Sequence, residues 1–529
     1  MACMTRRQFL RLSAIAAVAP TFGRSTAEAG TEKPPNIVFI LADDLGYGDV
    51  SCYGATKVKT PHIDRLAHEG LRFTDAHSPS SVCTPSRYNL LAGRYCWRTW
   101  AGTSCVWSTD PLLVDTDRLT LPKLLGHNGY ATACIGKWHL GFGRPGQEGW
   151  DDVYGLDYNR PLRPGPLEVG FDHFFGIPHV GQRPHVYIRD HDVVGRKPDD
   201  RIKVILDKDE RYRLPYTERP REGHTPAHRF EGTEGFSYSH EDLATRLTQE
   251  AVGWLERQTA DRPFFLYFAH RNVHTPIRPN PRFRGTSEIG AYGDFIHELD
   301  WCVGQILDTL DRQGLRGNTI VFFSSDNGAV ARGYRPADFV DYEGHRANGP
   351  WRGQKTEIYE GGHRVPFLVR WPGKIKPERT SSQLVATTDM LATVAELLGD
   401  TLPAGAGEDS FSFLPVLLDR TARRPVRDCL VNDSYTGEMS IRQGPWKLIL
   451  AQHGGGIGSK NRQDYPALPP GQLFNLDRDP TESRNLYADY PGKVEQLTGL
   501  LQRTRESGRS RPCPTGDLLL QERNMEKLT

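Results

Sequence analysis

The chain has 529 residues, of which 66 are Lys or Arg and 65 are Asp or Glu, so its formal net charge is +1 at neutral pH. Hydrophobic residues make up 37% and charged residues 25% of the chain, which is typical of a folded globular protein and not of a disordered or collagen-like one. The balanced charge argues against a nucleic-acid partner, and no stretch has the ~18–20 uninterrupted apolar residues that a membrane span needs.

Residues 1–29 have the pattern of a cleavable export signal. Arg6 and Arg7 precede a short apolar run at 12–22, and the segment ends in Ala-Glu-Ala at 27–29. The apolar run is too short to span a bilayer. The arginine pair is similar to the twin-arginine signal of bacteria, which is an address and not an anchor. We therefore predict export through the Tat translocation machinery to the periplasm or beyond; a basic amphipathic first helix is the alternative.

Short apolar runs alternate with helical patterns through the first two thirds of the chain. The runs lack polar alternation, which is typical of strands buried on both faces. They lie at 37–42, 131–135, 264–269, 319–323 and 365–369. The helical patterns lie at 60–70, 119–129, 240–258 and 292–313. This alternation predicts an α/β fold with a large, mostly parallel sheet covered by helices on both faces.

The pattern changes after Pro372. A helical pattern at 384–398 is followed by strand-like pieces at 429–432 and 446–451, and by an amphipathic helix at 494–505. We therefore predict a main domain at 30–372 and a smaller α+β subdomain at 373–529. The nine cysteines show no CxxC spacing, so neither a zinc site nor a disulfide scaffold is expected, although one or two bridges remain open.

Oxygen-bearing side chains follow two of the predicted strands. Asp43 and Asp44 come directly after the run at 37–42, and Asp326 and Asn327 follow the run at 319–323. Ligands of open α/β sheets bind beyond the carboxyl ends of the strands. Oxygen donors without a thiolate or an imidazole suit a hard cation such as Ca²⁺ or Mg²⁺. Two unrelated turns rich in Asp and Asn are the alternative.

A cysteine precedes a short predicted helix. Pro85 suits the first turn of that helix and Gly93 suits its end, so Cys83 is expected at the helix N-terminus. The positive end of the helix dipole favours a negatively charged oxygen or sulfur there. A buried structural cysteine is the alternative.

Basic side chains follow the other predicted strands. Lys137 and His139 come after the run at 131–135, and His274 comes after the run at 264–269 together with His270 and Arg271. Lys355 lies in a glycine-rich segment further along. Combined with a hard cation, these groups suit the transfer of a tetrahedral oxyanion, because cations stabilise the developing charge while a histidine handles the proton of the leaving group.

Three motifs resemble those of the type I, formylglycine-dependent sulfatases of the alkaline-phosphatase superfamily. They are Cys-x-Pro-x-Arg at 83–87, Leu-Leu-x-Gly-Arg at 90–94 and Gly-Lys-Trp-His-Leu-Gly at 136–141. The similarity runs in order from residue 36 to about 372 and is greatest to the arylsulfatase and N-acetylgalactosamine-6-sulfatase group. Ala92 departs from the pattern, because relatives usually carry Thr there.

The resemblance implies how such a site works. A sulfatase-maturing enzyme would oxidise Cys83 to formylglycine, and the hydrated aldehyde would attack sulfur. The implied ligands of Ca²⁺, in preference to Mg²⁺, are Asp43, Asp44, Cys83, Asp326 and Asn327. Sulfate would be held by Lys137, His274 and Lys355, with His270 and Arg271 as further substrate-binding residues. His274 and Lys355 would protonate the leaving alcohol, His139 would take the proton of the second hydroxyl, and Arg87 would brace the site.

Two long irregular segments, 142–235 and 331–352, are expected to shape the substrate pocket, with a neutral surface insertion as the alternative. The first holds 15 Lys or Arg against 17 Asp or Glu, which does not favour a groove for a polyanion. We expect a sulfated carbohydrate as substrate, of the 6-O-sulfated galactose or N-acetylgalactosamine type. The alternatives are a broad arylsulfatase, a phosphate or phosphonate ester hydrolase, and a glycan-binding pseudo-enzyme.

Overall fold

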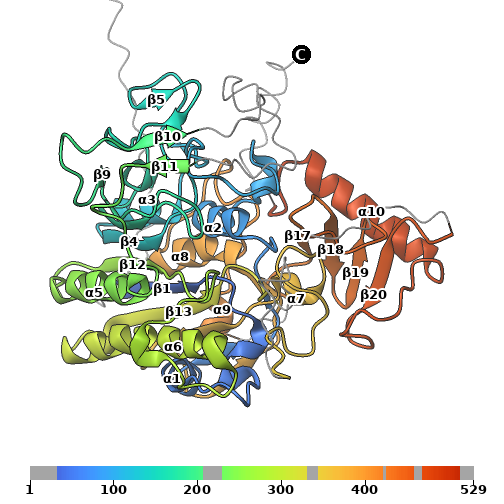
Figure 1. Ribbon diagram of the computed structural model, residues 1–529. Coiled ribbons are helices and arrows are strands. Elements are labelled where there is room, and N and C mark those ends of the chain that lie inside the picture. The colour runs from blue at the N-terminus through green and yellow to red at the C-terminus, as the bar shows by residue number, and fades with distance from the viewer. Residues whose placement is uncertain (1–32, 206–228, 331–343, 421–424, 458–466, 513–529) are drawn as a thin grey trace, which may run out of the picture. The chain divides into compact units, whose positions relative to one another are not determined.

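The computed structural model describes residues 33–205, 229–330, 344–420, 425–457 and 467–512, so the predicted export signal lies outside the described residues. A ten-stranded sheet forms its centre, in the order β15-β2-β14-β13-β1-β12-β4-β7-β8-β9 (Figure 1). Five neighbouring strands run parallel: β13 (Thr319–Ser325), β1 (Asn36–Ala42), β12 (Phe264–Ala269), β4 (Ala131–Lys137) and β7 (His173–Ile177).

The outer strands make the sheet a mixed one. On one side, β14 (Phe367–Arg370) pairs antiparallel with β13 and with β2 (Leu71–Phe73), and β15 (Arg379–Ser381) pairs parallel with β2. On the other side, β8 (Ile188–Arg189) and β9 (Asp192–Val193) are antiparallel. The predicted large, mostly parallel sheet is therefore confirmed in its central strands.

Apolar side chains bury both faces of the central strands. Successive residues of a strand point to opposite faces, so Phe39 of β1 lies in one hydrophobic cluster and Val38 and Ile40 lie in another. The first cluster includes α2 (Cys83–Ala92), α3 (Leu121–His127) and α8 (Met390–Leu398). The second includes α1 (Pro61–His68), α5 (Leu243–Glu256) and α6 (Gly290–Arg312). Helices thus cover both faces, as predicted (Figure 1).

Two predicted strands continue past their apolar runs. Gly136 of β4 pairs with Ala269, and Ser324 and Ser325 of β13 pair with Leu41 and Ala42. The ladder continues there because parallel pairing needs backbone groups and not apolar side chains. Each extension brings the strand directly to the polar residues that follow it.

A second, four-stranded antiparallel sheet lies in the C-terminal part of the chain. Its strands are β17 (Leu430–Asp433), β18 (Met439–Gln443), β19 (Trp446–Ile449) and β20 (Gln472–Asn475). Helix α10 (Pro491–Glu506) packs Leu497 and Leu501 on this sheet. The sequence predicted β17, β19 and the helix but missed β18 and β20, which lack a run of three apolar residues.

The segment after residue 373 contributes to both sheets. The predicted helix at 384–398 is β16 (Val385–Ala386), a 3-10 helix (Thr387–Asp389) and then α8. The Asp389 carboxylate accepts from the Ala386 N–H and so caps the start of the 3-10 helix. Strand β15 joins the ten-stranded sheet, and Leu391 of α8 packs in the same cluster as Leu91 of α2. A domain boundary at 373 stays a prediction.

Cysteines in the described ranges are free thiols, at positions 52, 83, 96, 105, 134, 302 and 429. Among the described helices, none has both the length and the apolar character required to cross a membrane.

Candidate active site

The carboxyl ends of β1 and β13 bring the predicted oxygen donors together. The strands are parallel neighbours with Ala42 paired to Ser325, so Asp43 and Asp44 emerge beside Asp326 and Asn327. The Asp44 N–H donates to Asp326 Oδ1 at 3.1 Å, and Asn327 Nδ2 donates to Asp44 Oδ1 at 2.8 Å. All four side chains are buried. The two acidic turns are therefore one cluster, although they lie more than 280 residues apart in the chain.

Three basic side chains bind these three carboxylates. Lys137 Nζ lies 2.8 Å from Asp43 Oδ2, and Lys355 Nζ lies 2.7 Å from Asp44 Oδ1. Arg87 donates Nε and Nη2 to Asp326 Oδ2 at 3.1 and 2.8 Å. Buried charges need such partners because desolvation is costly.

The charges around Asp43 decide its ionisation. Burial opposes the charged form, but the charge of Lys137, followed by those of His274 and Arg87, outweighs burial and holds the pKa of this carboxyl well below its usual range. Asp43 is therefore an anion at neutral pH and is ready to bind a cation.

The donor set fits a hard divalent cation. Asn327 Oδ1 is buried without a hydrogen-bond partner, which leaves one neutral oxygen free beside the carboxylates. His274 Nε2 lies 3.8 Å from Asp44 Oδ2, and ligand atoms of Asp43, Asp44 and His274 lie within 4.8 Å of one another. Carboxylate and amide oxygens are the ligands that Ca²⁺ and Mg²⁺ prefer.

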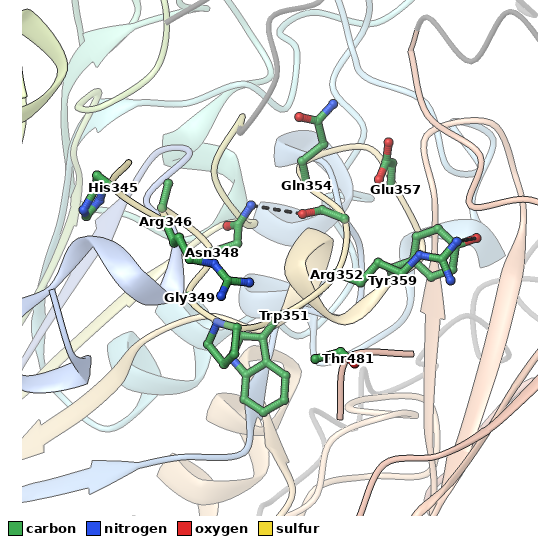
Figure 2. Close-up of a pocket in the computed structure, with 13 residues that line it drawn as sticks. His345, Arg346, Asn348, Gly349, Trp351, Arg352, Gln354, Glu357, Tyr359 and Thr481 are labelled. Carbon is green, nitrogen blue, oxygen red and sulfur yellow. Dashed lines mark hydrogen bonds between the residues drawn. The ribbon is translucent and has the colours of Figure 1, made fainter. Parts of the chain in front are cut away.

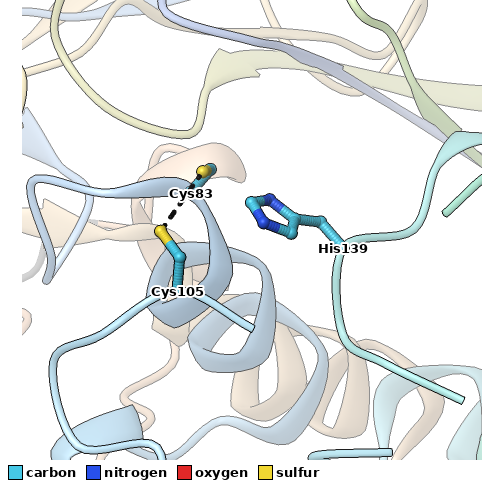
Figure 3. Close-up of side chains that lie close together, drawn as sticks. All are labelled: Cys83, Cys105 and His139. Carbon is cyan, nitrogen blue, oxygen red and sulfur yellow. Dashed lines mark hydrogen bonds between the residues drawn. The ribbon is translucent and has the colours of Figure 1, made fainter. Parts of the chain in front are cut away.

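Cys83 opens helix α2, as the sequence predicts, and Gly93 ends the helix in a left-handed conformation with φ of 61°. The thiol is almost fully buried beside Cys105, with 3.9 Å between the two Sγ atoms (Figure 3). The hydrogen bond with Cys105, together with the positive charges of the nearby Lys137 and Lys355, lowers the pKa of Cys83 well below its usual range, against the opposing effect of burial. The side chain at position 83 thus lies in surroundings that favour negative charge.

His139 lies directly after β4 and points at this position (Figure 3). A ring nitrogen of His139 and the Sγ atoms of Cys83 and Cys105 lie within 4.8 Å of one another. Both ring nitrogens are buried without a hydrogen-bond partner, and burial lowers the pKa of His139 to about 4. A neutral imidazole with a free nitrogen can accept a proton released at position 83.

His274, His270 and Arg271 form the turn after β12. His274 Nδ1 lies 2.5 Å from the Thr275 carbonyl oxygen, which orients its ring. His270 Nδ1 accepts from the Asn272 N–H at 3.1 Å, and the Arg271 guanidinium lies 4.6 Å from the centre of the Phe295 ring. His270 and Arg271 are fully buried around this turn. Substrate contact by these two residues stays a prediction.

Three residues near the reactive position were not anticipated from the sequence. Cys105 contacts Cys83, the His179 ring meets the His139 ring with 4.0 Å between centroids, and Trp107 stacks on His179. Cys105 and Trp107 lie in an irregular loop, and His179 lies in the predicted pocket segment 142–235. No spacing or motif marks them, so only long-range packing reveals their place.

A cavity of about 610 Å³ lies along the chain segment that leads to Lys355 (Figure 2). Most of its lining residues, 345–352, belong to the second segment predicted to shape the substrate pocket, 331–352, of which residues 331–343 lie outside the described residues. Asn348 exchanges hydrogen bonds with the backbone of Ala329, at 2.8 and 3.1 Å, and donates to the Gly353 carbonyl. This segment is thereby tied to the strand end that carries Asn327.

Comparisons with known proteins agree with this geometry. The chain matches the Sulfatase family model over residues 35–400. It is 38% identical over 486 residues to an N-acetylgalactosamine-6-O-sulfatase of Bacteroides thetaiotaomicron, covering 88% of this chain and 92% of that protein. It is 31% identical over 513 residues to the human N-acetylgalactosamine-6-sulfatase, covering 90% and 87%.

A solved structure supports the same assignment. It comes from work on the metabolism of multiple glycosaminoglycans by Bacteroides thetaiotaomicron, and it aligns with a TM-score of 0.78 and 35% identity over 90% of this chain and 100% of that chain. The family model, over residues 35–400, spans the acidic cluster, Cys83 and Lys355. The resemblance seen in the sequence is therefore confirmed: this chain belongs to the sulfatase family, whose members hydrolyse sulfate esters.

Proposed function

We propose that this sulfatase removes 6-O-sulfate from galactose or N-acetylgalactosamine units of a glycan. The observation that carries the proposal is the convergence of Lys137 and Lys355 on one buried acidic cluster, whose Asp43 and Asp326 lie close enough to Cys83 to interact with it electrostatically; this arrangement suits sulfate transfer. The sugar and the position follow from the two relatives at 38% and 31% identity, both named as N-acetylgalactosamine 6-sulfatases.

The proposal includes two groups that the chain would acquire. Cys83 would be converted to formylglycine by a sulfatase-maturing enzyme, and Ca²⁺ would be held by Asp43, Asp44, Asp326 and Asn327 together with the modified side chain. When present, the hydrated aldehyde supplies the attacking oxygen, and the cation stabilises the negative charge that develops on the sulfate oxygens.

The remaining steps fall to the chain's own side chains. Lys137, Lys355 and His274 bind the sulfate group, because their basic groups meet at the acidic cluster beside Cys83. His274 and Lys355 donate the proton that the leaving alcohol needs. His139 accepts a proton from position 83, for which its neutral ring and its unpartnered nitrogens suit it.

The mass of the tryptic peptide from Phe73 to Arg87 tests the first part of this proposal. In protein produced together with a sulfatase-maturing enzyme, we expect formylglycine at position 83 and an enzyme that releases sulfate. A Cys83→Ala variant is the matched control, because it keeps the fold and removes the modifiable thiol. Unmodified cysteine in an active wild-type enzyme would contradict the proposed nucleophile.

A substrate panel tests the second part. N-acetylgalactosamine 6-sulfate should be hydrolysed far faster than the 4-sulfate isomer, an aryl sulfate or the corresponding phosphate monoester. Equal turnover of aryl and sugar sulfates would favour a broad arylsulfatase. Faster phosphate release would favour a phosphate or phosphonate ester hydrolase, and tight glycan binding without turnover by fully modified protein would favour a pseudo-enzyme.

The proposed location is the periplasm or the exterior, reached through the Tat machinery. The Arg6-Arg7 pair, the short apolar run and the Ala-Glu-Ala ending support this. Replacing Arg6 and Arg7 with lysines should retain the protein in the cytoplasm of a bacterial host. Export of that variant at the wild-type level would exclude the twin-arginine route.

A further inference from the structure

A row of three aromatic rings leads away from the reactive cysteine. The His139 ring meets the His179 ring edge to face, with 4.0 Å between centroids and an interplanar angle of 78°. His179 in turn stacks on Trp107, at 5.9 Å and 23°. The three residues come from different parts of the chain: the end of β4, the segment after β7, and the loop between α2 and α3.

The loop that carries Trp107 is fixed to the reactive position. Cys105, two residues before Trp107, has its Sγ 3.9 Å from that of Cys83 (Figure 3). The Val106 N–H donates to Thr84 Oγ1 at 3.1 Å, and the same hydroxyl donates to the His139 carbonyl at 3.0 Å. The Trp107 N–H donates to Asp110 Oδ2 at 2.9 Å. Hydrogen bonds on both sides therefore hold the Trp107 backbone beside the helix that starts at Cys83.

Exposure increases along the row. His139 is 2% exposed and His179 is 7% exposed, whereas Trp107 is only half-buried. His179 Nδ1 is buried without a hydrogen-bond partner, and burial keeps the pKa of His179 well below its usual value, so its ring is an uncharged surface for Trp107. The indole is the ring of the three that offers the most surface to a ligand entering the site.

We propose that Trp107, held by His179, is a specificity-determining residue that packs against the sugar ring carrying the sulfate. The apolar C–H face of a pyranose stacks well on an aromatic surface, and such sites combine an aromatic wall with a few polar groups. Trp107 contacts the substrate, and His179 is a positioning residue. This inference rests on the proposed function, because it takes a sulfated pyranose as the substrate.

Substitution of the two residues tests the inference in the fully modified enzyme with N-acetylgalactosamine 6-sulfate. Trp107→Ala should raise KM about tenfold, with a smaller change in kcat, because a lost stacking contact weakens ground-state and transition-state binding alike. Trp107→Phe should recover most of the loss. His179→Ala should raise KM in the same direction, and His179→Phe, which keeps a ring beneath the indole, should restore it.

Two controls separate this role from a structural one. Inhibition by inorganic sulfate, which occupies only the sulfate-binding groups, should have the same constant in Trp107→Ala as in the wild type. Trp100→Ala removes a tryptophan that is 42% exposed in the same loop and should leave KM unchanged.

The outcomes distinguish the two proposals. If the wild type hydrolyses the sulfated sugar and Trp107→Ala keeps its KM within twofold, the inference is overturned and the proposed function stands. A sulfate inhibition constant that rises in parallel with KM would also overturn it, because the damage would then lie at the reactive centre. A wild type that releases no sulfate from any sulfated sugar would overturn both.

Discussion

Arg87 offers a direct measure of how strongly the charges of the active site depend on one another. Its guanidinium is fully buried, donates twice to Asp326 Oδ2 and donates Nη1 to the Lys137 carbonyl at 2.9 Å. Removing one partner of a buried, hydrogen-bonded ion pair costs about 3–5 kcal/mol, because the other partner is left charged and unpaired. We therefore predict that Arg87→Met lowers the free energy of unfolding by this amount.

The expected change in melting temperature follows from the size of the protein. An unfolding entropy of ~2.1 cal/mol/K per residue gives about 1 kcal/mol/K for a chain of roughly 500 residues, so the loss corresponds to about 3–5 °C. Calorimetry at pH 7 in the presence of a chelator measures it. The chelator matters because a bound divalent cation would itself compensate the unpaired carboxylate.

Two variants make this test specific. Arg160→Met removes an exposed arginine that pairs with Glu148, and its melting temperature should change by less than about 1 °C because surface pairs contribute little. Adding Asp326→Asn to Arg87→Met should restore part of the loss, because the orphaned charge is gone. If Arg87→Met alone has a melting temperature within 1 °C of that of the wild type, the reasoning is refuted.

Three further predictions concern the cation, the pH and the second thiol. Calcium at a hundred times its dissociation constant should stabilise the wild type by about 2.7 kcal/mol, and Asp43→Ala, which removes one proposed ligand, should lose this shift in a thermal melt. Burial lowers the pKa of His270 to about 3 in the folded protein, from about 6.5 for an exposed histidine. The folded state is therefore fully stable with respect to this group above pH 6.5, and it loses stability as the pH falls towards 3, because the unfolded chain takes up the proton first. The free energy of unfolding should fall by about 2 kcal/mol between pH 7 and pH 5 for this reason, and His270→Gln should flatten that fall. Equal slopes of stability against pH in the wild type and in His270→Gln would contradict the role of His270. In protein that has escaped maturation, a mild oxidant should join Cys83 and Cys105, and peptide mapping should find no such bridge in Cys105→Ser; a bridge from Cys83 to any other cysteine would contradict the contact seen here.

The sequence allowed the reactive elements to be predicted wherever their chemistry follows directly from a regular element. Asp43 and Asp326 each come just after a buried apolar strand, and Cys83 begins a helix whose end is marked by Gly93. Such positions depend on backbone periodicity and on helix-end preferences, which act over a few residues. Strands β18 and β20 gave no such signal, because neither contains three consecutive apolar residues, unlike the segments around β17 and β19; each takes its place by pairing with β19.

By itself, the sequence determined the α/β architecture of the central sheet, the family motifs and most residues of the acidic and basic cluster. Only the tertiary structure decided which charge meets which: Lys137 on Asp43, Lys355 on Asp44, and Arg87 on Asp326. It alone placed Cys105 beside Cys83 and His179 between His139 and Trp107. The physical reason is that side chains on irregular loops take their positions from packing against distant parts of the chain, and this packing leaves no period or spacing in the sequence to detect.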